Sequence, residues 1–322
     1  MPNAVVPTVV STPDINRGTT NIQLPAEVSQ EIWAKVLEES VFMRLADKVD
    51  MPGSGKTIQT ITGEPEAEWV DETAPKPVST HSFGKKSVTP YKLAVIEPFS
   101  MEFMRDKKKL YNECVRRLPK ALSKKFDSTI ISTTAPGSGF DVLGGCTKVS
   151  LLEDRANGIT AYDRFVTIDG IIAAADGIMN GIALATQGKS LVLGAKDGQG
   201  HPLFTSGVES NTVGNILGSK VIVAKGVYKA GTAASGTSGQ EGYVAGIPAI
   251  VGVAGDWDDA QYGTVEGIKM DVSKEATLIT EDGIISLFQQ NMVAVRVEIE
   301  VGFVVKDASE FVLLTGNVPS AA

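Results

Sequence analysis

The chain has 322 residues, of which 43% are hydrophobic, and this is enough apolar side chain to build a buried core in two lobes. No apolar run approaches the roughly 18 residues of a membrane-spanning helix, and the first residues lack the basic segment of a secretory signal. The formal net charge of −8 argues against a general nucleic-acid binder.

Cysteines and histidines are few, and this limits the chemistry. Cys114 and Cys146 match no zinc or redox spacing and are expected to be reduced thiols. His81 and His201 cannot form a metal cluster, and no serine stands in a G-x-S-x-G nucleophile motif. The sequence therefore predicts no catalytic residue, no cofactor and no metal site, and no enzymatic activity is expected.

The chain begins with a segment that has no sustained period. Residues 1–24 are therefore predicted to form an extended arm that is ordered only against another surface. A helix is predicted over residues 25–49, because Val28, Ile32 and Val36 recur at helical spacing.

A phosphate-binding loop is the first functional question, because Gly55-Lys56-Thr57 resembles the end of the motif G-x-x-x-x-G-K-[ST]. The first glycine of that motif would stand at position 50, where the chain has Asp50, whose charge would repel a phosphate. A helix is predicted before Lys56 and a strand after it, whereas a P-loop joins a strand to a helix. We interpret the segment as a turn with a solvated lysine, and a P-loop enzyme is the weaker alternative.

Residues 51–98 have the pattern of a two-stranded ribbon. Ile58 and Ile61 lie among threonines, which favours strand. Such a ribbon has almost no core of its own, so its stabilising surface is expected on a partner. Helix is excluded and a central strand made unfavourable by Pro65, Pro75, Pro77, Pro90 and Pro98.

A long helix is predicted from Ser100 to residue 132. Ser100 is a suitable N-cap, and a kink or break is expected at Pro119, which lies inside the pattern. The predicted buried face consists of Leu118, Leu122, Phe126 and Ile130.

A second lobe is predicted after this helix. It contains a helix over residues 168–186, whose apolar face would be Ile171, Ala175, Ile178 and Ile182. Short strands are predicted over residues 189–195, 219–227, 247–255 and 266–273, with a flexible Gly/Ser/Thr-rich loop over 228–243.

The last part of the chain carries the clearest strand pattern. Apolar side chains alternate with others from Val293 to Phe303, and residues 310–316 supply a final strand. Before them, Asp256, Asp258 and Asp259, near Glu266, raise the question of a calcium site. Their spacing is not that of an EF-hand, and an acidic surface turn is favoured.

The segment EAEWVDETAPKPVSTHSFGKKSVTPYKLAVIEPFSMEFMRD resembles the extended loop and spine helix of tailed-bacteriophage major capsid proteins of the Hong Kong 97 type. The resemblance rests on Ala67, Trp69, Val70, Glu72, Lys92-Leu93, Ser100 and Glu102. KDGQGHPLF and ILGSKVIVAKGV are similar to the family's lobe-forming segment. LFQQNMVAVRVEIEVGFVVKDASEFVLL resembles its C-terminal end, through Arg296, Gly302-Phe303 and Phe311. The matches fall in order over about residues 25–315.

The resemblance implies an α+β fold, the Hong Kong 97-type capsid fold, with an N-terminal arm, an extended β-ribbon loop, a peripheral domain with a long spine helix, and an axial domain. The implied boundaries are 1–50 for the arm and first helix and 51–98 for the extended loop. Residues 99–139 and 291–322 would form the peripheral domain, and residues 140–290 the axial domain. The stretch before KDGQG is short for the family, which predicts a trimmed axial domain. The long, charged, helical N-terminal extension that some members use as a built-in scaffold is not found here. The chain would therefore be a processed form, use a separate scaffold or need none, and the last two are favoured.

The implied function is that of a major capsid protein that assembles into pentamers and hexamers of an icosahedral shell around double-stranded DNA. Its partners would be copies of itself, neighbouring capsid subunits, packaged DNA through non-specific contacts, and possible scaffold, portal and decoration proteins, with no membrane. It would be made in the bacterial cytoplasm and reside in the virion capsid. An encapsulin-like nanocompartment shell of the same fold is the alternative, although the long ribbon favours the viral version.

Two sets of residues are the candidate sites. Intersubunit contacts are predicted at Trp69, Glu72, Lys85 and Lys86 on the ribbon, with local packing as the alternative for Trp69. Residues 100–133 hold nine basic and four acidic residues, a net +5 that leaves −13 for the rest of the chain. A solvated helix face would explain this charge. In the resembled family the helix lies toward the shell interior, so DNA-facing roles are predicted for Arg117, Lys120 and Lys124.

Covalent locking of the shell is not expected. Some members of the resembled family join a lysine to an asparagine, but no pair here matches the required positions. The candidates are Lys76, Lys85, Lys86, Lys92, Asn291 and Asn317. A ladder of multimers that survives denaturing electrophoresis would contradict noncovalent locking.

Overall fold

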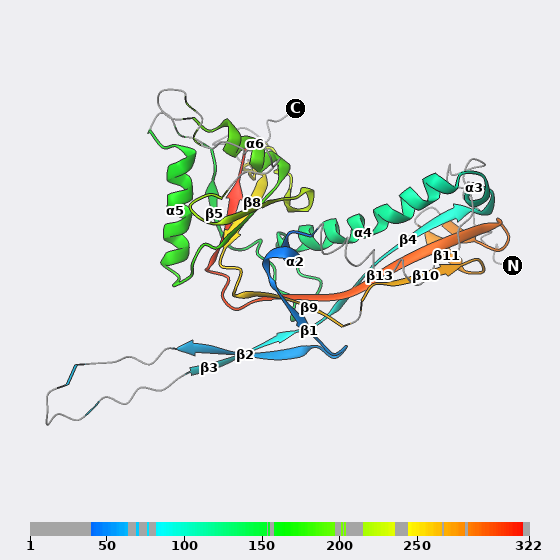
Figure 1. Ribbon diagram of the computed structural model, residues 1–322, viewed down its shortest axis with the longest axis horizontal. Helices are drawn as coiled ribbons and strands as arrows, with labels where there is room; N and C mark the ends of the chain where they lie inside the picture. The colour runs from blue at the N-terminus through cyan, green and yellow to red at the C-terminus, as the bar shows by residue number, and fades with distance from the viewer. Residues whose placement is uncertain are drawn as a thin grey trace. The chain divides into compact units, whose positions relative to one another are not determined.

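Figure 1 shows a computed structural model of the chain. The structure describes residues 40–63, 69–70, 76, 82–152, 154, 158–196, 201, 203, 215–235, 244–265, 267–280 and 283–317. The chain divides into two compact units. The first comprises Met1–Arg44, Lys92–Asp127 and Glu266–Glu300, and the second comprises Leu45–Tyr91, Ser128–Val265 and Val301–Ala322. The predicted arm, residues 1–24, lies outside the described residues.

The first unit combines helix with antiparallel strands. Helices α3 (Met101–Asp106) and α4 (Lys108–Ile130) follow strand β4 (Tyr91–Ser100), which pairs with β13 (Met292–Val305). Strand β10 (Lys269–Ser273) pairs antiparallel with residues 294–298 of β13. Strands β11 (Thr277–Thr280) and β12 (Gly283–Ser286) form a separate hairpin.

The long helix begins as predicted but is interrupted elsewhere. Ser100 caps α3, its Oγ accepting a hydrogen bond from the amide of Glu102 at 3.2 Å. The break lies at Lys107, whose φ of −138° and ψ of 61° leave the helical region, and α4 continues through Pro119. The predicted break at Pro119 is therefore wrong. A helix can retain a proline when tertiary packing holds the flanking turns, and Pro119 is buried here. The predicted buried face is confirmed at Leu118, Leu122, Phe126 and Ile130.

The second unit is built on a mixed sheet with the strand order β5-β14-β8-β6-β7. These strands are β5 (Thr147–Ser150), β14 (Phe311–Thr315), β8 (Ile250–Gly255), β6 (Gly181–Leu184) and β7 (Lys220–Val223). The β5–β14 and β6–β7 pairs are parallel, whereas β8 runs antiparallel to both β14 and β6. Strand β14 therefore lies inside the sheet of the second unit. The predicted peripheral domain instead groups residues 291–322 with the long helix. The domain boundaries stay a prediction.

Helices α5 (Ala161–Ala173) and α6 (Thr186–Gly194) supply apolar side chains to the core of this unit. The predicted helix over 168–186 and the predicted strand over 189–195 are both wrong. Thr160 and Asp163 form a capping box that starts α5 well before residue 168. The helix ends in a turn where Asp176 has a φ of 63°, and Ile182 belongs to the buried strand β6. Ile178, predicted to be buried, is 74% exposed.

The start of the described chain also differs from expectation. The predicted helix over 25–49 lies outside the described residues as far as residue 39. Beyond it, helix α2 (Phe42–Leu45) ends before β1 (Asp47–Asp50). Strand β1 pairs parallel with β9 (Ala260–Thr264), which pairs antiparallel with residues 301–305 of β13. Backbone pairing with β9 therefore overrides the helical pattern after Leu45.

The two-stranded ribbon is confirmed over residues 56–63 and 82–88, whereas the end of the predicted range, residues 91–98, belongs to β4, which pairs with β13. Strands β2 (Lys56–Gly63) and β3 (Ser82–Val88) form a sheet of their own, in antiparallel register (Figure 1). Lys56 begins a strand and not a helix, and Gly55 turns with a φ of 83° while its amide donates to Pro52 O at 2.9 Å. The helix N-terminus that a phosphate-binding loop requires does not follow Lys56.

Several further strand predictions are confirmed by β7, β8, β10, β13 and β14. A short 3-10 helix, η1 (Lys225–Val227), precedes the loop predicted over 228–243. Its first part then forms isolated bridges, among them Thr232 with Ile247 and Ser235 with Val244. Within the described residues, no helix combines the length and the apolar character needed to cross a membrane.

Candidate functional surfaces

Trp69 lies on the ribbon with its indole fully open to solvent. Its relative exposure is 103%, and that of Val70 beside it is 39%. An indole left in water gains no burial energy, which suits a side chain that is buried by a neighbouring copy. The intersubunit role and the local-packing alternative both stay predictions. Glu72 lies outside the described residues, and its predicted contact stays a prediction.

Lys85 and Lys86 are neighbours on β3, so their side chains point to opposite faces of the ribbon. Lys85 is exposed. Lys86 is directed into its own chain, where its Nζ lies 2.8 Å from Asp141 Oδ2 and donates to Val305 O. The predicted intersubunit role therefore stays open for Lys85, whereas the Lys86 ammonium is already bound within the subunit.

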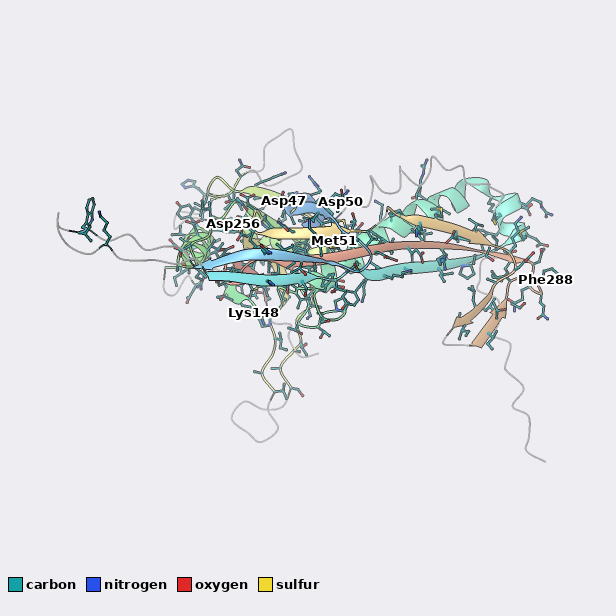
Figure 2. All side chains as sticks on the ribbon, turned by 90° about the horizontal axis from the view of Figure 1, so that it is seen from below. Asp47, Asp50, Met51, Lys148, Asp256 and Phe288 are labelled. Carbon is teal, nitrogen blue, oxygen red and sulfur yellow. The ribbon has the colours of Figure 1, made fainter. Side chains whose placement is uncertain are left out.

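The base of the ribbon rests on a small apolar cluster. Met51, Val88 and Val304 are buried there, with Val49 and Ile58 packed against them. Figure 2 labels Met51 among the side chains of the molecule. Met51 lies so close to Gly263 of β9 and Gly302 of β13 that a Cβ at Gly263 would stand 2.3 Å from its Sδ. This close approach seats the ribbon base on β9 and β13.

The exposed face of α4 is basic. Arg117 Nε lies 3.2 Å from Glu113 Oε1, one helical turn away, and such an exposed pair contributes only about 0.3–0.5 kcal/mol. The exposed basic residues are Arg116, Arg117, Lys120, Lys124 and Lys125, and the buried apolar ones are Val115, Leu118, Leu122 and Phe126. The predicted DNA-facing residues thus share one solvent-facing surface.

Asp127, on the buried side of the same helix, was not singled out by its sequence context. It is 1% exposed, and its carboxylate accepts hydrogen bonds from Ser40 Oγ at 2.7 Å and from the amide of Val41 at 3.3 Å. Burial raises the pKa of Asp127 to about 7, against the opposing effect of these hydrogen bonds. This carboxyl group therefore anchors the segment that enters α2.

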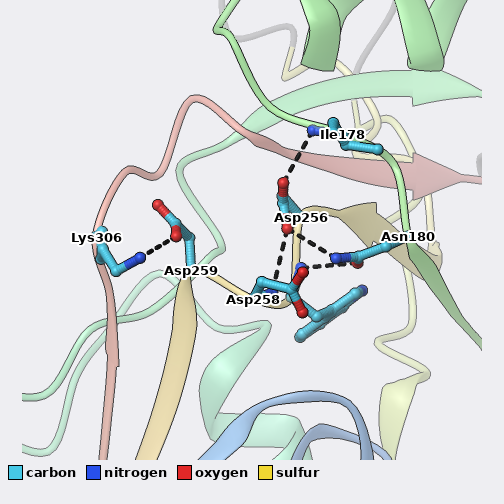
Figure 3. Close-up of polar contacts among 7 residues, drawn as sticks. Ile178, Asn180, Asp256, Asp258, Asp259 and Lys306 are labelled. Carbon is cyan, nitrogen blue, oxygen red and sulfur yellow. Dashed lines mark hydrogen bonds and ion pairs between the residues drawn. The ribbon is translucent and has the colours of Figure 1, made fainter. Parts of the chain in front are cut away.

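The acidic turn after β8 is organised by Asp256 (Figure 3). Its Oδ2 accepts from the Ile178 amide at 2.9 Å, and its Oδ1 accepts from Asn180 Nδ2 at 2.8 Å and from the Asp258 amide at 3.1 Å. Asn180 in turn accepts from the amide of Trp257, whose Nε1 donates to Gly181 O at 2.8 Å. Asp256 therefore ties the end of β8 to the segment that leads into β6.

Asp259 and Glu310, two other acids of this region, lie near Lys306. This lysine forms an ion pair with Asp259 (Figure 3). Burial, followed by the charges of Asp259, Asp256 and Asp307, raises the pKa of Glu310 to about 7. Glu266 lies outside the described residues. In the part of the chain that the structure describes, no three His, Cys, Asp or Glu side chains are arranged to hold a metal ion.

A family model described as the phage capsid family matches residues 21–316. The probable major capsid protein gp17 of Mycobacterium phage L5 is 30% identical over 309 residues, covering 91% of this chain and 89% of the relative. The corresponding protein of Mycobacterium phage D29 is 28% identical over 303 residues, covering 92% and 90%.

Solved structures give the same result at the level of the fold. A chain from Mycobacterium phage Adephagia superposes with a TM-score of 0.68 at 17% identity, covering 88% of this chain and 92% of its own. One from Mycobacterium phage Ogopogo gives a TM-score of 0.66 at 18% identity, covering 98% and 97%. The matched region agrees with the ordered resemblance found over about residues 25–315.

Proposed function

The chain belongs to the phage capsid family and has the Hong Kong 97-type capsid fold, and we propose from this that it is the major capsid protein of a tailed bacteriophage. The observation that carries this function is the family match over residues 21–316, together with 30% identity to a protein named as a probable major capsid protein. Its place is the virion capsid, where it assembles into capsomers with other capsid subunits.

We propose pentamers and hexamers of this chain as the capsomers, closed into an icosahedral shell around double-stranded DNA. The ribbon supports this arrangement. A two-stranded ribbon is marginal in isolation, and the exposed Trp69 and Lys85 leave it with surface to bury on a neighbouring copy. Each contact can be weak, because a closed shell engages every subunit with several neighbours at once.

The basic face of α4 is proposed to lie against the packaged DNA. Its support is the charge and exposure of Arg117, Lys120 and Lys124, on a chain whose net charge is −8. Lysine and arginine side chains that neutralise phosphates bind DNA without reading its sequence. This surface would offset repulsion between the acidic shell and the genome.

The test of the proposed function is the assembly state of the purified chain. Negative-stain microscopy and sedimentation should show icosahedral shells or capsomer rings. A discrete monomer or dimer under all assembly conditions, with or without added scaffold, would contradict the proposal. Particles isolated from infected cells should contain DNA. Shells that carry a protein cargo and no DNA would instead support the nanocompartment alternative.

A further inference from the structure

Lys86 fixes one strand of the ribbon to the body of the second unit. Its Nζ lies 2.8 Å from Asp141 Oδ2 and donates to Val305 O at 2.5 Å. Asp141 Oδ2 also accepts from the amide of Val305 at 3.1 Å, and the Asp141 amide donates to Phe303 O at 2.9 Å. One carboxylate thus joins strand β3 to the end of strand β13.

Two more hydrogen bonds continue this attachment where the chain leaves β3. The amide of Thr89 donates to Gly139 O at 2.9 Å, and the Tyr91 hydroxyl donates to Ser138 O at 2.8 Å. The Tyr91 ring also meets Phe140 edge-on, with ring centroids 6.3 Å apart. The attachment points on the body are therefore consecutive in the loop that follows α4.

The shape of this loop is matched to the exit of β3. Gly139 has a φ of 77°, and a Cβ there would stand 2.5 Å from Thr89 Oγ1 and 3.0 Å from Ser87 O. Only glycine adopts this conformation without strain and also permits so close an approach. The loop and the strand exit therefore fit together through their backbones as well as through the Lys86–Asp141 ion pair.

We propose that Lys86 and Asp141 are positioning residues, whose ion pair and shared contact with Val305 set the direction in which the ribbon leaves the subunit. A ribbon held only at its apolar base could pivot, because two strands alone are marginally stable. Because β3 is fixed at successive points, the ribbon already has its direction in the free subunit. Association with a neighbouring copy then loses less conformational entropy. We call the contacts of Lys86 with Asp141 and Val305 the clamp. Its importance for assembly rests on the proposed function, whereas the clamp itself is a property of one subunit.

The clamp is tested on unassembled subunits. Spin labels at Gln59→Cys on the ribbon and Lys148→Cys on β5, with Cys114 and Cys146 changed to Ser, report the distance between ribbon and body. We expect a narrow distance distribution in the reference protein and in Lys85→Met, and a broadened or shifted one in Lys86→Met. Lys86→Arg should restore the narrow distribution, because it keeps the charge and the donors. An unchanged distribution in Lys86→Met, or equal broadening in Lys85→Met, overturns the clamp.

The second measurement is the yield of closed shells at equal concentrations of folded subunit. Thermal unfolding of Lys86→Met should stay close to that of the wild type, because a partly exposed ion pair contributes little to stability. Its shell yield should fall by about tenfold through lost preorganisation. If Lys86→Met does not fold, Asp141→Asn makes the same comparison, because it retains an acceptor for the Val305 amide.

The two measurements separate the possible outcomes. Fewer shells with an unchanged distance distribution would make Lys86 an interface residue and overturn the positioning role. A broadened distribution with a normal shell yield would show that ribbon direction does not limit assembly, which also contradicts the proposal. If the wild type forms no shells under any condition, the proposed function fails, and the distance measurement still decides the clamp.

Discussion

Asp127 is buried as an acid, and its environment disfavours the charged form. Burial raises its pKa from 3.8 to about 7, although hydrogen bonds with Ser40, Val41 and Phe42 act in the opposite direction. Because the folded pKa lies above the unfolded one, the folded state binds more protons between the two values. The resulting stabilisation is fully present below the unfolded pKa and is lost as the pH rises through about 7.

The first prediction is that stability decreases as the pH rises, because the pKa of Asp127 is higher in the folded state than in the unfolded state. The melting temperature of the unassembled subunit should fall from about pH 5 to about pH 8, and Asp127→Asn should reduce the fall. Asparagine is uncharged and still offers an acceptor to Ser40 and Val41. Since one pKa unit corresponds to about 1.4 kcal/mol, the dependence should amount to a few kcal/mol. The measurement is a pair of thermal melts across this range.

Glu310 also has a pKa raised to about 7, so it contributes to the pH dependence of stability with the same sign as Asp127. The two contributions must therefore be separated. The comparison is therefore made in a Glu310→Gln background, in which the remaining dependence should come mainly from Asp127. A pH dependence that is identical with and without Asp127→Asn in this background would contradict the prediction.

The second prediction concerns two glycines of the second unit. A Cβ at Gly181 would stand 2.5 Å from Trp257 Cδ1, inside a fully buried strand, so Gly181→Ala should destabilise the subunit by about 1–3 kcal/mol. Gly170 lies within α5 with nothing within 4 Å of such a Cβ, so Gly170→Ala should stabilise it by about 0.5–1 kcal/mol. Chemical denaturation of both variants measures the pair, and equal effects of the two substitutions would contradict this account.

At the level of elements, sequence periodicity predicted those with one buried face. Strand β13 alternates in sequence from Val293 to Phe303, and its burial alternates over residues 295–301, where one face contacts a core. The α4 pattern likewise identified the buried side chains of that helix. Strand β6 could not be found in this way. All four of its residues are buried, so Ile182 does not alternate with a polar neighbour and fitted a helical pattern equally well.

The candidate surfaces were predicted unevenly for a related reason. Exposure and charge on α4 follow from local spacing, so Arg117, Lys120 and Lys124 could be singled out as basic residues of the helix surface, and all three are exposed. Asp127 meets a residue 87 positions earlier in the chain, and Lys86 meets one 219 positions later. Spacing along the sequence does not predict contacts between residues so far apart. The contacts of Asp127 and of Lys86 could therefore be identified only from the structure.

The third prediction tests the basic face of α4. Changing Arg117, Lys120 and Lys124 together to glutamine should leave shell assembly intact, because the three side chains are exposed. Packaged genomes should become shorter, or DNA-filled shells should break open more readily at low salt, because fewer phosphates are neutralised. Particle density and the length of extracted DNA are the measurements.

The matched control removes the same charge from another part of the chain. Lys148, Lys225 and Lys229 are exposed in the second unit, and their change to glutamine alters the net charge equally. An equal loss of packaged DNA in the control would assign the effect to total charge. No loss in the α4 variant would show that this face is only solvated.

At the scale of the whole molecule, Trp69 distinguishes folding from assembly. Its indole is fully exposed in the single chain, so Trp69→Ala should leave the melting temperature of the unassembled subunit unchanged. If Trp69 anchors the ribbon on a neighbouring copy, its loss should weaken that contact by about 2 kcal/mol or more, as for buried aromatic anchors at other interfaces. This corresponds to roughly a thirtyfold weaker contact, and light scattering should show a higher subunit concentration at the onset of assembly.

Two variants make this fourth prediction specific to the aromatic ring. Trp69→Phe should recover much of the assembly, because a smaller ring still fills part of a pocket on the neighbour. Lys76→Ala removes another exposed ribbon side chain and should change the threshold little, because isolated surface charges contribute about 0–1 kcal/mol. If Trp69→Ala assembles at the wild-type concentration, the ribbon must hold its neighbour through backbone and polar contacts. If it instead lowers the melting temperature of the free subunit, Trp69 stabilises its own chain and not the shell.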